Sequence, residues 1–188
     1  MKDLIERLLF LARADMNRQA LNRTPVDMAE LVGDVAKKAE LVAADHTLTL
    51  AANDAGTIAG DPVLIRQMLR IFLDNAIKYT PQGGHIALAS RREGDRLHVT
   101  VADDGIGIAP EHQERIFERF FRVDSARTKE SGNKAGGTGL GLAIARWIAD
   151  AHGIELSLDS APGRGTTIHL LIPLAEDAAT DKGSPPLP

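Results

Sequence analysis

Residues Gly136 to Leu142 read GGTGLGL and constrain the fold of this chain more than any other stretch. Their alternating glycines leave room for a close ligand and can take positive φ: Gly137, Gly139 and Gly141. Residues 140–152 are mostly apolar or helix-forming, and Gly153 follows them as a typical C-terminal cap. The loop therefore opens a helix whose free N–H groups can bind phosphate. Taken alone, it could equally be a tight turn.

The composition is typical of a globular domain with one core. Of 188 residues, 44% are hydrophobic and 26% are charged. The net charge of −4 argues against nucleic acid as a partner. The absence of cysteine excludes disulfides, zinc–thiolate sites and thiol catalysis. No apolar run is long enough to span a bilayer, so we expect a soluble chain without membrane contact.

Apolar spacing and capping residues predict three helices before the glycine loop. Residues 1–22 carry the apolar stripe of a helix that packs against a partner. This helix is either the end of a longer helical element or an N-terminal helix packed on its own domain. After a break at Pro25, Asp27 can cap a helix that runs to about Ala44. Asp61 followed by proline predicts a helix to about Lys78.

Alternating residues predict six strands: 46–51, 56–59, 85–92, 97–103, 154–158 and 166–173. The third and fourth form an antiparallel hairpin around residues 93–95. Between residues 108 and 135 regularity falls, apart from helical turns near 110–120, and such a long connection is usually functional or mobile. The tail from 175 to 188 has the composition of a disordered segment.

Two groups of polar residues precede the glycine loop. Asn75, Lys78 and Tyr79 share one helix face, with an amide suited to Mg²⁺ and a cation suited to phosphate. A solvated helix end would look the same. Asp103 ends a strand just before Gly105 and Gly107, where its carboxylate could bind an exocyclic amine such as that of adenine. The alternative is an Asp-Gly turn. Their joint order favours a nucleotide site.

Five stretches resemble, in order and spacing, the N, G1, F, G2 and G3 boxes of sensor histidine kinases. They are LDNAIKYTP (73–81), DDGIGI (103–108), IFERFFR (116–122), GGTGLGLAI (136–144) and GRGTT (163–167). The wider superfamily includes DNA gyrase and mismatch-repair ATPases. The resemblance implies a two-layer α/β sandwich over residues 24–174, in which a mixed, mainly antiparallel sheet packs on about three helices. It also implies a mobile ATP lid at about 109–136.

The resemblance also assigns roles. Asn75 would hold Mg²⁺, Asp103 would bind the adenine amine, and the glycine loop would cradle the phosphates of ATP. Among the basic residues of the lid, Arg122 is the first candidate for neutralising the triphosphate. The nucleotide-binding residues expected in this way are Asn75, Lys78, Tyr79, Asp103, Gly105, Gly107, Arg122, Gly137, Thr138, Gly139, Leu140, Gly141 and Thr166.

The chain departs from the family pattern in two ways. Ile71 stands where many histidine kinases carry another Asn and gyrase-like enzymes carry the Glu that activates water, which argues against an independent ATPase. None of the six histidines has the acidic and Thr-Pro context of the family's phospho-acceptor. No catalytic residue is therefore expected within this chain. Residues 1–23 resemble the end of the second helix of the dimerisation hairpin that normally carries that histidine.

The expected function is binding of Mg-ATP and positioning of its γ-phosphate for transfer to a histidine absent from this chain. The implied partners are the His-bearing hairpin of the parent kinase and a response regulator. The implied location is the cytoplasmic part of a membrane-bound sensor kinase. The alternatives are a nucleotide-sensing interaction module, a gyrase-like ATPase, which Ile71 disfavours, and a related serine kinase.

Overall fold

The computed structural model describes residues 2–16, 20–123 and 138–175. Its centre is a five-stranded sheet in the order β2-β4-β5-β7-β6. The strands are β2 (Thr47–Asn53), β4 (His85–Glu93), β5 (Arg96–Asp103), β7 (Thr166–Pro173) and β6 (Glu155–Ser160). Only the β2–β4 pair of this sheet is parallel; the other neighbours are antiparallel. The predicted mixed, mainly antiparallel sheet is confirmed.

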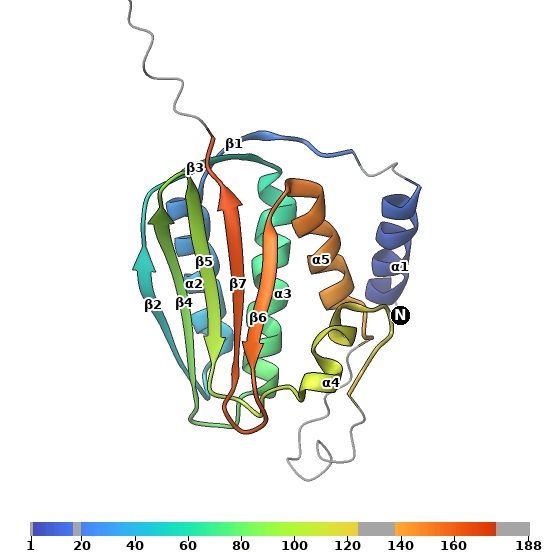
Figure 1. The fold of residues 1–188 in the computed structure, drawn as a ribbon, viewed down its shortest axis with the longest axis vertical. Coiled ribbons are helices and arrows are strands. Elements are labelled where there is room, and N and C mark those ends of the chain that lie inside the picture. Colours follow the sequence, from blue (N-terminus) through green and yellow to red (C-terminus); the bar gives the residue numbers. More distant parts are fainter. Residues whose placement is uncertain (1, 17–19, 124–137, 176–188) are drawn as a thin grey trace, which may run out of the picture.

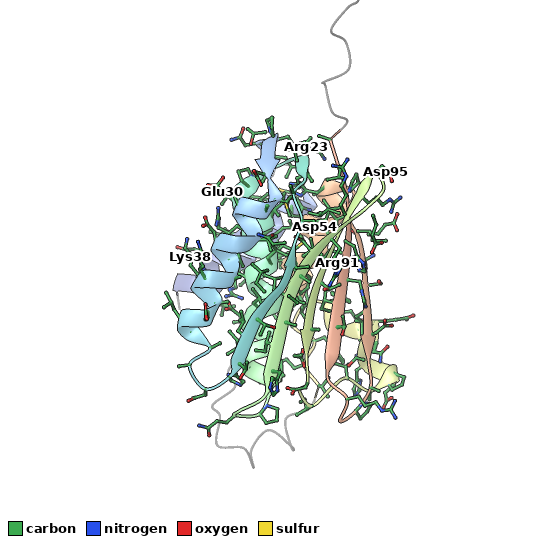
Figure 2. All side chains as sticks on the ribbon, turned by 90° about the vertical axis from the view of Figure 1, so that its left-hand side faces the viewer. Arg23, Glu30, Lys38, Asp54, Arg91 and Asp95 are labelled. Atoms are coloured by element: carbon green, nitrogen blue, oxygen red, sulfur yellow. The ribbon has the colours of Figure 1, made fainter. Side chains whose placement is uncertain are left out.

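One face of this sheet is covered by α2 (Met28–Val42), α3 (Pro62–Tyr79) and α5 (Gly141–His152). Figure 2 shows the two layers from the side, with Glu30 and Lys38 on the outer surface of α2. The core lies between the layers and includes fully buried side chains from both: Met28, Ile65, Met68, Leu88, Val99, Ile144 and Leu170. The other face of the sheet is open to the front in Figure 1. The predicted two-layer α/β sandwich is therefore confirmed.

The N-terminal helix α1 (Lys2–Asp15) packs outside α5 rather than on the sheet (Figure 1). The Phe10 and Trp147 rings meet edge to face, with centroids 5.1 Å apart, and Leu11 is buried. A second apolar side of α1 stays exposed: Leu4, Ile5, Leu8 and Leu9. The helix predicted over 1–22 was too long. By Asn22 the chain is no longer helical, and the Asn22 N–H donates to Asp61 Oδ2 at 3.1 Å.

One short strand was not predicted from the sequence. β1 (Thr24–Asp27) pairs antiparallel with β3 (Thr57–Gly60), with Pro25 opposite Ala59. The sequence predicts only a break at Pro25, but proline is tolerated at the edge of a sheet, where its missing N–H leaves no ladder bond unmade. The predicted helix cap that follows is confirmed, because Asp27 Oδ1 accepts the N–H of Glu30 at 3.1 Å.

Asp61 joins three parts of the fold. Its Oδ1 accepts the N–H groups of Val63 and Leu64 at 3.0 and 3.2 Å, which confirms the predicted cap of α3. Its own N–H donates to Nε2 of the buried His152 at 3.0 Å. The second ring nitrogen of His152 therefore carries the proton and donates to the Ile148 carbonyl at 2.8 Å. Asp61 thus links α3, the C-terminal end of α5 and the segment before β1.

Replacing Asp61 by alanine is expected to lower the free energy of unfolding by about 2 kcal/mol, the upper end for loss of an N-cap. The reason is that the carboxylate is buried and accepts bonds from three backbone N–H groups. Asp27→Ala is the control, since Asp27 caps α2 from an exposed position, and about 1 kcal/mol is expected. Urea denaturation measures both. Equal losses would show that burial of the cap adds nothing.

Candidate functional site

The first half of the candidate site lies where β5 and β7 meet. Asp103 ends β5 opposite Thr166, the first residue of β7. Its Oδ1 accepts the N–H of Gly105 at 2.9 Å, and the backbone of Thr166 also donates to the carboxylate. Burial raises the pKa of Asp103 above its ordinary value, although these two backbone donors oppose the shift. The half-buried carboxylate still has lone pairs available for a further donor.

The neighbouring aspartate behaves in the opposite way. The backbone N–H of His85 donates to Asp104 Oδ1 at 2.8 Å, and this bond lowers the pKa of the exposed Asp104. In a carboxyl ¹³C NMR titration, we expect Asp103 to titrate above 3.8 and Asp104 below it. Because the pKa of Asp103 is raised in the folded state, its ionisation lowers the free energy of unfolding as the pH rises through this pKa. The contribution of Asp104 is lost instead as the pH falls through its lowered pKa. Titration in the reverse order would contradict the assigned contacts.

Two glycine turns pack backbone against backbone beside Asp103. A Cβ at Gly105 would lie 2.6 Å from the Tyr79 carbonyl oxygen. Gly107 has a φ of 67°, and a Cβ there would collide with the carbonyl of Ala161. Gly165, with a φ of 77°, leaves no room for a Cβ beside the Asp103 carbonyl. These positions therefore require glycine for space as well as for conformation.

Ser160 connects these turns, and sequence reasoning missed it. Its hydroxyl accepts the N–H of Ile108 at 2.8 Å and donates to the Gly165 carbonyl at 2.8 Å. It also lies 2.9 Å from the Thr166 hydroxyl. The Gln113 side chain donates to the carbonyls of Ile108 and Ser160 at 3.1 and 2.8 Å. A serine at a strand end and a glutamine in a loop carry no motif that could have predicted this contact.

The end of α3 lies against the first turn. The Tyr79 carbonyl accepts the N–H of Ile106 at 3.2 Å, and the tyrosine side chain is exposed. Lys78 Nζ lies 4.9 Å from the centroid of the Tyr79 ring. Asn75 is half-buried one turn earlier on α3. The structure thus brings Tyr79 close to Asp103 and Gly105, with Lys78 and Asn75 further along the helix.

The second half of the site is the start of α5. Gly139 has a φ of 70°, and its carbonyl accepts the N–H of Phe120 at 2.9 Å. The Thr138 hydroxyl is buried and finds no hydrogen-bond partner among the described residues. Leu140 is fully buried, and a Cβ at Gly141 would lie 3.5 Å from Ile71 Cγ2. Because Ile71 lies two turns before Tyr79, the two halves are about 12 Å apart along α3.

Part of the predicted lid is described. Its expected helical turns are α4 (Pro110–Gln113) and a 3₁₀ helix (Arg115–Phe117), and Arg122 is exposed beyond them. Gly137, the lid residues from 124 onwards and the tail from 176 lie outside the described residues.

Two hollows of the surface do not coincide with this site. One of about 380 Å³ lies between α2 and β2, and another of about 520 Å³ lies beside Phe117 and Arg146. Neither is lined by Asn75, Tyr79, Asp103 or the glycines of the site, although Gln113 lines the second. Within the described ranges, no three His, Asp or Glu side chains converge in a way that could hold a metal ion. No helix in this part of the chain is long and apolar enough to cross a membrane.

Comparison with known proteins identifies this arrangement. The family model described as "Histidine kinase-, DNA gyrase B-, and HSP90-like ATPase" matches residues 60–176, which include α3, both glycine turns and the start of α5. The chain belongs to this ATPase family. The resemblance of the five sequence boxes to sensor histidine kinases is thereby confirmed.

Several curated relatives are named as sensor histidine kinases. "Sensor-like histidine kinase SenX3" of Mycobacterium tuberculosis is 37% identical over 186 residues, which are 97% of this chain and 44% of the relative. "Sensor histidine kinase WalK" of Bacillus subtilis is 36% identical over 183 residues, which are 95% of this chain and 29% of the relative. The chain spans less than half the length of these two relatives.

This chain also resembles solved structures in its fold. "Mycobacterial sensor histidine kinase MprB" superposes with a TM-score of 0.69 at 28% identity, over 81% of this chain and 97% of that one. "ShkA full-length in complex with AMPPNP" gives a TM-score of 0.76 at 30% identity, over 92% of this chain and 35% of that one.

Proposed function

We propose that this chain is the Mg-ATP-binding domain of a sensor histidine kinase, and that it positions the γ-phosphate of ATP for transfer to a histidine outside this chain. The observation that carries the proposal is the pair of half-sites that lie beside α3, one against Tyr79 and the other against Ile71. At one end a half-buried Asp103 carboxylate faces two glycine turns, and at the other a glycine loop opens α5. A nucleotide with an amine at one end and phosphates at the other suits both.

At the first half-site, Asp103 accepts a hydrogen bond from the exocyclic amine of adenine. Gly105 and Gly107 let the turns pack backbone against backbone beside Asp103, and Tyr79 lies against the first turn. Thr166 holds the Asp103 carboxylate through its backbone, and its hydroxyl lies 2.9 Å from that of Ser160. The single acceptor group and the close backbone favour adenine over larger or amine-free bases.

At the second half-site, backbone N–H groups of Gly137, Gly139, Leu140 and Gly141 bind phosphate oxygens at the positive end of α5. The buried Thr138 hydroxyl, which lacks a partner among the described residues, can donate to phosphate as well. Lys78 and Arg122 neutralise charge on the triphosphate. The Asn75 amide oxygen holds Mg²⁺, an ion that takes few protein ligands and completes its shell with water and phosphate oxygens. When bound, the ion withdraws charge from the phosphates.

The catalytic contribution of such a domain is positioning and charge neutralisation, as in phosphoryl transfer generally. The side chain nearest to Gly141 on α3 is the apolar Ile71, which cannot activate water for hydrolysis. In this proposal, the phosphate passes instead to an imidazole supplied by the parent kinase. We assign α1 to the end of the hairpin that carries it and residues 24–174 to the catalytic domain. In this proposal, the domain lies in the cytoplasm as part of a membrane-bound kinase and serves a response regulator.

The decisive experiment uses Mg-ATP labelled on the γ-phosphate, after nucleotide binding to the chain has been measured. The chain alone should bind ATP, take up no label and release little phosphate. After addition of a His-bearing hairpin domain from a histidine kinase, label should appear on that domain. Steady phosphate release would support the gyrase-like ATPase instead. Binding without transfer to any acceptor would support a nucleotide-sensing module, and label on the chain itself would contradict the missing acceptor.

Asn75→Ala is expected to abolish the Mg²⁺ dependence of nucleotide binding. In the wild type, ADP should bind more tightly with MgCl₂ than with EDTA, whereas the variant should bind equally in both, because its only amide ligand is lost. Titration calorimetry measures the four affinities. Gln67→Ala is the matched control, since it removes another half-buried amide of α3 two turns away. If the Mg²⁺ dependence survives in Asn75→Ala, the metal assignment is wrong.

A further inference from the structure

Residues 110–121 touch both halves of the proposed nucleotide site. They contain α4 and the 3₁₀ helix, and we call them the connecting segment. In Figure 1 this segment lies near the start of α5, and α4 contacts β6 while the 3₁₀ helix contacts α5. The sequence predicted it only as helical turns within the lid. Its contacts at both ends give it a further role.

Gln113 fixes the connecting segment to the half-site of Asp103. Its amide nitrogen donates to the carbonyls of Ile108 at 3.1 Å and Ser160 at 2.8 Å. Because carbonyl oxygens only accept hydrogen bonds, the NH₂ group of Gln113 must face them. The N–H of Ile108 in turn donates to the Ser160 hydroxyl at 2.8 Å. Ile108 ends the turn that follows Asp103, so a shift of this turn moves Gln113 as well.

Phe120 fixes the other end of the segment to the glycine loop. Its N–H donates to the Gly139 carbonyl at 2.9 Å, and a Cβ at Gly139 would lie 2.8 Å from the Phe120 backbone. Phe120 has a φ of 62°, and no other non-glycine residue in the described part of the chain has a positive φ. This conformation is strained for a residue with a Cβ and persists only where the surrounding contacts hold it. The connecting segment is thus held against the loop that is proposed to bind phosphate.

Between its two ends, the connecting segment is braced internally but has few contacts with the core. Arg115 Cζ lies 4.3 Å from the centroid of the Phe121 ring, and the His112 ring centroid lies 5.8 Å from it. Ile116 is buried and Phe117 is half-buried against the core. A segment with few buried contacts has little stability of its own. A ligand that fixes one end therefore orders the segment and lowers the cost of fixing the other end.

We propose that the connecting segment couples the two half-sites, so that a base at Asp103 strengthens phosphate binding at the glycine loop. By linkage, phosphate strengthens binding of the base by the same factor. Gln113 and Phe120 are positioning residues in this coupling, because they hold the segment at its two ends. α3 also runs past both half-sites, but many of its side chains are buried in the core, so it keeps one arrangement. The inference rests on the proposed function, since both half-sites must bind their parts of ATP.

The test supplies the two parts of the nucleotide separately to the full chain, as adenosine and magnesium pyrophosphate. NMR titration measures the affinity for adenosine without pyrophosphate and with a saturating concentration of it. In the wild type, pyrophosphate should raise the adenosine affinity about fivefold or more, as is typical of coupled sites. In Gln113→Met, which removes both donated hydrogen bonds, this ratio of affinities should fall to near one. A merely structural role of Gln113 would lower both affinities and leave their ratio unchanged.

Two further variants sharpen the comparison. Gln113→Glu keeps the size and polarity of the side chain, but an ionised carboxylate cannot donate, so the ratio should fall in this variant too. Gln67→Met is the matched control, since it replaces a half-buried amide of α3 outside the connecting segment. It should keep the ratio of the wild type. Circular dichroism of each variant checks that the fold is retained.

Failure of the coupling and failure of the proposed function give different results. If the wild type binds neither adenosine nor pyrophosphate, the proposed function is wrong and the coupling with it. If the wild type binds both but independently, only the coupling is wrong. The coupling is also overturned if Gln113→Met keeps the ratio of the wild type, or if Gln67→Met loses it equally.

Discussion

Asp103→Asn is expected to weaken the binding of ATP and ADP by about a hundredfold, since a hydrogen bond to a charged group contributes about 1.5–3 kcal/mol. The carboxylate accepts from the Gly105 N–H and from the backbone of Thr166, and in the proposed site also from the adenine amine. An asparagine has one acceptor oxygen and one NH₂ donor. In either orientation of the amide, its NH₂ group faces one of the N–H donors that the carboxylate accepts, and that hydrogen bond is lost. Titration calorimetry with ADP at neutral pH measures the loss.

Asp104→Asn is the control for Asp103→Asn. It removes a negative charge one residue away, but its carboxylate is exposed and bonded to His85. A change of less than about twofold is expected, because the field of an exposed charge is screened by solvent. If both variants lose affinity equally, the net charge of this turn is responsible rather than a direct contact. If Asp103→Asn binds ADP normally, Asp103 is not part of the site.

Gly107→Ala is expected to lower the free energy of unfolding by about 3–5 kcal/mol, the range of severe local disruption. The residue has a φ of 67°, which costs an L side chain about 1–2 kcal/mol. In addition, its Cβ would overlap the carbonyl of Ala161, so the turns at 104–108 and 161–165 would have to separate. Urea denaturation followed by circular dichroism measures the change.

Gly94→Ala separates the two causes. Gly94 has a similar φ of 64° in the β4–β5 hairpin, but a Cβ there would meet nothing within 4 Å. Only the conformational cost of about 1–2 kcal/mol is therefore expected. The excess loss in Gly107→Ala reports the collision with Ala161. If the two losses were equal, the turns beside Asp103 would be loosely packed, and their glycines would not be needed for space.

The parts of the fold that could be predicted from the sequence depend on a few neighbouring residues. Asp27 and Asp61 cap their helices as expected, and Gly153 ends α5 with a φ of 67°. The β4–β5 hairpin follows from alternation around a short turn. The order of the five boxes indicated the family before any tertiary contact was known, because each box is a local pattern. Such features were predictable because caps, turns and side-chain periodicity depend only on residues that are close together in the sequence.

Tertiary packing decided the rest. Pro25 marked a break in sequence, yet β1 forms because β3 lies alongside it. The parallel pairing of β2 with β4 also depends on α3, the helix that returns the chain across the sheet between them.

Within the candidate site, the sequence alone determined which residue types are available, including the carboxylate, the amide and the glycines. The tertiary structure decided that Gly107 meets Ala161, that Gly141 lies beside Ile71, and that Ser160 joins the turns. The contacts of Gly107 with Ala161, of Gly141 with Ile71 and of Ser160 with Ile108 join residues about 50 to 70 positions apart. Their formation depends on burial of the shared core, which no local pattern specifies.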